Sequence, residues 1–218
     1  GADFQTGAPI EIVVWTKEEG SRLAPAMVGS GTFAGIFALA DSLAIADADG
    51  LTMGEELARI GYDGEGCGDR EFGAYFEAHI EQGPILEAAG KPVGVVTGAQ
   101  GQRWYEINLT GQESHAGPTP MAVRRDALVG AAEIVLAVNR IGHEFQPGAC
   151  ATTGMIISRP NSRNVIPGAV FLTVDLRHPD DARLAEMDTA LRDAAGAAAD
   201  ANGLDLALEQ IWSFDATP

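Results

Sequence analysis

The feature that most constrains the fold of this chain is the spacing of apolar residues after residue 98, which changes along the sequence in a definite order. An alternating or continuous apolar run predicts a strand, and apolar residues three to four apart predict a helix. The predicted strands are 105–110, 151–158, 169–177 and 204–211, and the predicted helices are about 119–139 and 181–202, the latter ending at Gly203. This order is the ferredoxin-like β-α-β-β-α-β unit. We therefore predict a compact domain over residues 98–212 and a short linker over 213–218.

The first 97 residues have a different pattern, which predicts part of an α/β domain. Residues 10–15 and 74–80 are short apolar runs typical of buried parallel strands. The first run leads into two adjacent carboxylates, Glu18 and Glu19, and the second ends on His79. Ligands of open α/β sheets bind at the carboxyl ends of the strands. The overall fold class is therefore α/β, with a candidate site in the first domain.

Charge and composition exclude several partners. The formal net charge is −17, which argues against binding a nucleic-acid backbone or an anionic membrane. The sequence has no signal-peptide pattern and no apolar run long enough to span a bilayer. Its two cysteines, Cys67 and Cys150, have no partner spacing and are interpreted as reduced thiols. These features predict a cytoplasmic protein.

Several candidate site residues also have a purely structural interpretation. Two adjacent glutamates can form a solvated turn, and a histidine at a strand end is more often structural than a ligand. Asn164 can be a turn former. Asp175 and Arg177 share one face of a strand, so they can form an internal ion pair, although arginine is also well suited to bind a carboxylate.

Four motifs in a fixed order carry a resemblance to a known family. They are residues 17–22 (KEEGSR), 79–84 (HIEQGP), 115–121 (HAGPTPM) and 161–168 (NSRNVIPG). Together they resemble the amidase/hydantoinase/carbamoylase family, whose members are dinuclear-metal amidohydrolases related to aminoacylases and dipeptidases. Residues 102–106 (QRWYE) are most similar to the N-carbamoyl-L-amino acid hydrolases, with the allantoate amidohydrolases as close rivals.

The resemblance implies hydrolysis of a linear ureido C–N bond with two divalent metals. Carried over by position, Glu18 would be the general base for the water between the metals. Glu19 would bind one metal and His79 the other. Zn²⁺ is the first choice of metal, and Mn²⁺, Co²⁺ or Ni²⁺ are alternatives, because mixed oxygen and nitrogen ligands do not select among them. The first domain would be part of a zinc-aminopeptidase-like catalytic domain.

The resemblance also assigns roles to the second domain, as a lid that forms a homodimer. His115 would stabilise the oxyanion of the tetrahedral intermediate in the active site of the neighbouring subunit. Asn164 and Arg177 would hold the substrate carboxylate, and Gln82 would line the pocket near the metals.

The sequence departs from the family pattern at both ends. Of the metal ligands that the resemblance implies, only Glu19 and His79 are found, so we expect this polypeptide by itself to bind metal poorly and to be inactive. Two alternatives remain open. One is a metal-free dimerisation or binding fragment, and the other is an aminoacylase or dipeptidase, against which the residues 81–84 (EQGP) argue.

Overall fold

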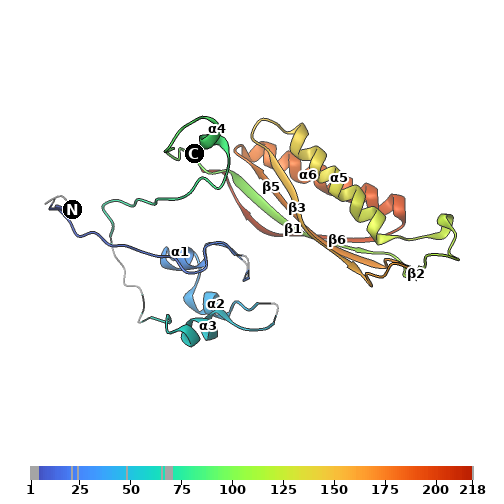
Figure 1. Ribbon diagram of the computed structural model, residues 1–218, viewed down its shortest axis with the longest axis horizontal. Coiled ribbons are helices and arrows are strands. Elements are labelled where there is room, and N and C mark those ends of the chain that lie inside the picture. Colours follow the sequence, from blue (N-terminus) through green and yellow to red (C-terminus); the bar gives the residue numbers. More distant parts are fainter. Residues whose placement is uncertain are drawn as a thin grey trace. The chain divides into compact units, whose positions relative to one another are not determined.

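The computed structural model describes residues 5–20, 22–23, 25–47, 49–64, 66 and 71–217 (Figure 1). The chain divides into two compact units, unit 1 (Gly1–Ile80) and unit 2 (Glu81–Pro218). The boundary between the units lies earlier in the chain than the predicted domain boundary after residue 97, which stays a prediction. Cys150 is an exposed free thiol, and Cys67 lies outside the described residues.

Unit 2 is built on a four-stranded antiparallel sheet with the strand order β3-β5-β1-β6. Its strands are β1 (Gly101–Thr110), β3 (Cys150–Arg159), β5 (Ala169–His178) and β6 (Asp205–Phe214), and its long helices are α5 (Ala127–Glu144) and α6 (Asp181–Asn202). Apart from a two-stranded ribbon and short turns, this is the predicted β-α-β-β-α-β order, which is confirmed. The strand β6 extends to Phe214 and so includes the first residues of the predicted linker.

The core of unit 2 lies between the sheet and its two helices, which are side by side on one face of the sheet (Figure 1). Alternate residues of β1, namely Tyr105, Ile107 and Leu109, are at most 1% exposed. Because strand side chains alternate between the two faces, one face becomes a continuous apolar surface. The helices cover it with Ile134, Val138, Leu184, Met187 and Leu191, all buried. On the opposite face Met155 and Ile157 stay 49% and 42% exposed.

Local signals set the helix ends. The side chain of Asp180 accepts hydrogen bonds from the first backbone N–H groups of α6, and Gly203 ends this helix at φ 63°.

The prediction for α5 was wrong at its start: the helix begins at Ala127, not near residue 119. The N-cap of α5 is Asp126. Before it, Met121–Val123 form a separate 3₁₀ turn after Pro120.

Unit 1 contains three short helices, α1 (Val28–Phe33), α2 (Leu39–Ala44) and α3 (Met53–Ile60). They enclose a small core of Leu23, Val28 and Met53. A capping box between Thr52 and Glu55 begins α3, and Gly61 at φ 73° ends it. The single-turn helix α4 (Ile85–Ala88) belongs to unit 2 and follows Pro84.

The two buried strands predicted for unit 1 are wrong in this structure. Residues 10–15 and 74–80 are irregular, and Ile12, Val14 and Phe76 are 92%, 89% and 93% exposed. A strand needs neighbours for its backbone N–H and C=O groups. Among the described residues of unit 1, no sheet offers them. None of the described helices is long and apolar enough to cross a bilayer, and the cytoplasmic location stays a prediction.

Replacing Leu172 at the centre of β5 should test the core. Leu172 is 0% exposed, so Leu172→Ala removes buried apolar atoms and leaves a cavity, which should lower the free energy of unfolding by about 2–5 kcal/mol. Urea denaturation followed by circular dichroism measures this loss. The matched control is Ile157→Ala on the open face of the same sheet, which should cost less than half as much. Equal losses would contradict the assignment of the core.

Candidate functional site

The two predicted carboxylates, Glu18 and Glu19, stand on a turn that is attached to the start of α1. The backbone carbonyls of residues 16–18 accept hydrogen bonds from the N–H groups of residues 27–29 at 2.8–3.2 Å. A side chain at Gly29 would lie 2.3 Å from the carbonyl oxygen of Thr16, so this close approach requires glycine. Both glutamates are exposed. The turn is therefore held by its backbone, and the carboxylates are left accessible.

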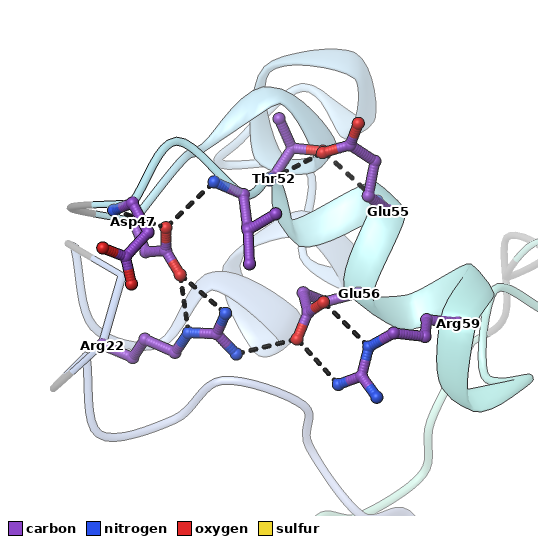
Figure 2. A network of polar contacts seen from close by, with 8 residues as sticks. Arg22, Asp47, Thr52, Glu55, Glu56 and Arg59 are labelled. Carbon is purple, nitrogen blue, oxygen red and sulfur yellow. Dashed lines mark hydrogen bonds and ion pairs between the residues drawn. The ribbon is translucent and has the colours of Figure 1, made fainter.

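An ion-pair network lies next in sequence and joins this turn to α3. Figure 2 shows Arg22 between two carboxylates: its Nε donates to Asp47 Oδ2 and its NH1 to Glu56 Oε2, both at 2.8 Å. Arg59 donates to both oxygens of Glu56 at 2.9 Å. Asp47 in turn accepts the backbone N–H groups of Asp49 and Leu51. Arg22 thus links the segment after the two carboxylates to a turn and a helix about 25–34 residues later.

No sequence pattern identifies the partners of Arg22. Asp47 and Glu56 lie in an Asp- and Glu-rich stretch where nothing in the local pattern distinguishes them from surface residues. The side chain of Asp47 is nevertheless only 5% exposed, against 52% for Arg22. The pairing depends on the tertiary contact between the two segments, so a local signal could not have found it.

His79 is exposed and has one nitrogen committed to the backbone. Its Nδ1 contacts the carbonyl oxygen of Ile80. A carbonyl can only accept, so in the neutral imidazole Nδ1 carries the proton and Nε2 has the lone pair that could bind a metal. Gln82 adopts a positive φ of 51°, and Glu81 accepts the first N–H groups of α4.

The described residues do not form a complete metal site. Among them, no group of three or more His, Cys, Asp or Glu side chains could hold an ion. A zinc site needs at least three protein ligands. Glu19 and His79 are compatible with metal binding by residue type, but they fit a site only together with further ligands.

The loop that carries His115 is held by backbone pairing. The strands β2 (Ser114–His115) and β4 (Val165–Ile166) form a two-stranded ribbon, in which His115 is opposite Val165. The next N–H group, that of Ala116, donates to the carbonyl oxygen of Asn164 at 2.9 Å. The structure therefore brings together two predicted site residues, His115 and Asn164, which are almost 50 residues apart in the sequence.

Two further contacts set the chemistry of this loop. The N–H group of Gly117 donates to His115 Nδ1 at 3.0 Å. Because an N–H group can only donate, the neutral imidazole carries its proton on Nε2 and can donate a hydrogen bond from there. Arg124 donates to the carbonyl oxygens of Ala116 and Thr119 at 2.8–3.1 Å. Its guanidinium therefore joins two positions of the loop that follows His115. No sequence motif indicates this role of Arg124.

Arg177 lies at the other end of the sheet. Its exposed guanidinium pairs with Asp175, with 2.7 Å between NH2 and Oδ2. β5 begins at Ala169, next to the ribbon, and reaches Arg177 only at its far end (Figure 1). At about 3.3 Å per residue, a ten-residue strand is roughly 30 Å long. Within one chain, Arg177 is therefore too far from His115 and Asn164 to contact the same small molecule.

Comparisons with known proteins match both units. A model described as a peptidase dimerisation domain matches residues 97–202. An N-carbamoyl-L-amino-acid amidohydrolase of Rhizobium meliloti is 46% identical over 97% of this chain and 51% of its own length. A probable allantoate deiminase of Oryza sativa subsp. japonica is 34% identical over 96% of this chain and 48% of its own length.

A solved structure is also similar. It is an amidase of the hydantoinase/carbamoylase family from Burkholderia vietnamiensis, 64% identical with a TM-score of 0.86, and the match covers 93% of this chain and 49% of that chain. The present chain spans about half the length of the curated relatives that it matches.

The Arg22 network should make unit 1 sensitive to acid. Hydrogen bonds from Arg59 and Arg22 lower the pKa of Glu56 from 4.5 to about 2. A carboxylate with a lowered folded-state pKa stabilises the fold above its unfolded pKa and loses that contribution as the pH falls. Protection of α3 against hydrogen exchange, corrected for intrinsic rates, should therefore decrease between about pH 4.5 and 2.

Glu56→Gln should lower this protection at pH 6 and flatten its dependence on pH across the same window. Glu87→Gln, on the separate helix α4, is the matched control and should leave α3 unchanged. An unaltered pH dependence in Glu56→Gln would show that the network does not stabilise α3.

Proposed function

This chain belongs to the hydantoinase/carbamoylase family of amidases, and from that premise we propose that it is half of a metal-dependent amidohydrolase that acts on N-carbamoyl-L-amino acids. Water would be added across the ureido C–N bond, which releases the amino acid, carbon dioxide and ammonia. The observation that carries the proposal is the 46% identity, over nearly the whole chain, to a relative named for this activity.

Several side chains of this chain have the chemistry for this reaction. Glu18 is an exposed carboxylate on a backbone-held turn and would accept the proton of the attacking water. His115 has its Nε2–H available and would donate it to the oxyanion that forms on the carbamoyl carbon. Arg177 is an exposed guanidinium and would bind the substrate carboxylate, with Asn164 as a second donor from the other chain. Gln82 would line the pocket.

The separation of these residues supports an active site shared between two chains. His115 and Asn164 are at one end of the sheet of unit 2 and Arg177 is at the other, roughly 30 Å apart by strand length. A substrate a few ångströms long can contact both sets only if one set comes from a second copy. We therefore propose a homodimer in which His115 and Asn164 of one chain complete the site of the other.

Unit 2 has a surface suited to such a dimer. β3 is an edge strand, because it pairs only with β5 in the described sheet. An unpaired edge is a template for pairing with another chain. On this strand, Met155 and Ile156 are 49% and 48% exposed. The match of residues 97–202 to a peptidase dimerisation domain agrees with this surface.

The complete enzyme would use two divalent metals, Zn²⁺ as the first choice and Mn²⁺, Co²⁺ or Ni²⁺ as alternatives. Glu19 would bind one metal and the Nε2 of His79 the other, with the remaining ligands outside the described residues. When bound, such ions polarise a carbonyl group and ionise water near neutral pH.

Two alternatives have specific support. The 34% identity to a probable allantoate deiminase favours allantoate, another linear ureido compound, as the substrate. The incomplete metal site among the described residues favours a dimerisation or binding role for these 218 residues when they are present alone. The two alternatives apply to different polypeptides, so the length of the purified protein must be established first.

The experiment that tests the proposal compares ammonia release by the complete protein from N-carbamoyl-L-amino acids and from allantoate, before and after removal of metal. We expect higher kcat/KM for the carbamoyl amino acids, loss of activity on chelation, and recovery with a divalent metal. Preference for allantoate would replace the first substrate class with the second. Activity that chelation does not affect would overturn the metal requirement.

The shared site predicts complementation between inactive chains. Dimers that combine His115→Ala with Glu18→Ala contain one intact site, so a random mixture should regain about a quarter of wild-type activity. As a control, Glu18→Ala mixed with a chain carrying both substitutions should regain none, since every site then lacks Glu18. No recovery in verified mixed dimers would remove the claim that His115 acts across the dimer.

A further inference from the structure

The proposed carboxylate-binding residue, Arg177, is paired with a carboxylate of its own chain, Asp175. Asp175 is an anion at the place where an anionic substrate would bind, and it is in direct contact with the guanidinium. By charge alone it should oppose binding of a carboxylate. The contacts around it suggest a different role.

Asp175 occupies one edge of the guanidinium. Nε of Arg177 donates to its two carboxylate oxygens at 3.2 and 3.1 Å, and NH2 donates to Oδ2 at 2.7 Å. NH1 makes no such bond among the residues that the structure describes. A guanidinium has a second edge, formed by NH1 and the outer hydrogen of NH2, that matches a carboxylate with two parallel hydrogen bonds. This second edge remains available.

Asp175 is itself held in place. Gln102, which is only 6% exposed, donates from Nε2 to Asp175 Oδ2 at 3.1 Å. The strand register explains the contact: Gln102 is directly opposite Arg177, and Trp104 is directly opposite Asp175. Directly paired residues of an antiparallel ladder share one face, and diagonal neighbours are within reach of long side chains. The three polar residues therefore form one row across β1 and β5.

We propose that Asp175 is a positioning residue, which takes the Nε edge of Arg177 and leaves the NH1/NH2 edge to bind the substrate carboxylate, while Gln102 holds Asp175. An arginine side chain loses much rotamer freedom when it binds a ligand. The Asp175 contact restricts that freedom before the substrate arrives, so less is lost on binding. The proposal rests on the role of Arg177 in the proposed function and concerns affinity, not the chemical step.

The test uses Asp175→Asn in the complete enzyme. Asparagine has nearly the same shape but only one acceptor oxygen, so it cannot hold the Nε edge in the same way. We expect KM for an N-carbamoyl-L-amino acid to rise about 3- to 10-fold and kcat to stay nearly unchanged. The rise in KM reflects the entropy lost when the Arg177 side chain, no longer ordered in advance, is immobilised by the substrate. If charge repulsion dominated, KM would fall instead. An unchanged or lowered KM would overturn the proposal.

A double-mutant cycle distinguishes positioning from a general structural effect. If Asp175 acts through Arg177, Asp175→Asn should change KM little when Arg177→Lys is already present, because lysine lacks the two-edged fork. An equal rise in KM in both backgrounds would contradict the proposed mechanism. The matched control is Glu186→Gln, which removes the same charge from a 2.7 Å ion pair with Arg183 on α6 and should leave KM unchanged.

Arg177→Ala separates this inference from the proposed function. If the complete enzyme hydrolyses its substrate but Arg177→Ala leaves KM unchanged, the carboxylate role of Arg177 fails, and the positioning role fails with it. If Arg177→Ala raises KM and Asp175→Asn does not, only the positioning role fails. Metal content and the thermal midpoint, measured on every variant, identify any that have lost their fold.

Discussion

The antiparallel pairing of β1 with β5 is the constraint on which the rest of unit 2 depends. The two strands are paired over ten residues, from Gly101 opposite His178 to Thr110 opposite Ala169. This register places one set of alternate side chains under α5 and α6, where their burial stabilises the fold. It also places the polar row of Gln102, Asp175 and Arg177 at one end of the sheet. The length of the same pairing keeps Arg177 far from the ribbon that carries His115.

Backbone groups determine the state of both candidate histidines. The N–H group of Gly117 leaves His115 with a donor at Nε2, whereas the carbonyl of Ile80 leaves His79 with a lone pair at Nε2. The first form suits an oxyanion donor and the second suits a metal ligand. These opposite tautomers agree with the different roles proposed for the two residues. In both cases the tautomer is assigned from a contact with the backbone and not with another side chain.

The accuracy of the sequence-based predictions differs between the units. In unit 2, each strand pairs with others from residues 101–214, so local periodicity was sufficient to predict the element order. In unit 1, the apolar runs at residues 10–15 and 74–80 predicted strands, but the described residues supply no neighbouring strand. The motifs contain the candidates Glu18, His79 and His115, and the resemblance added Arg177, which lies outside them. They did not identify Arg124 or Asp47, whose partners are set by folding.

The sequence by itself determined the helix α6, from the cap at Asp180 to Gly203, and the β-α-β-β-α-β order, because capping and periodicity act over a few neighbouring residues. Only the tertiary structure decided that His115 meets Asn164 and that both are separated from Arg177. It also decided that Gln102 holds Asp175 across two strands that are more than 70 residues apart. The physical reason is that these contacts depend on strand register, which arises only when distant segments pack together.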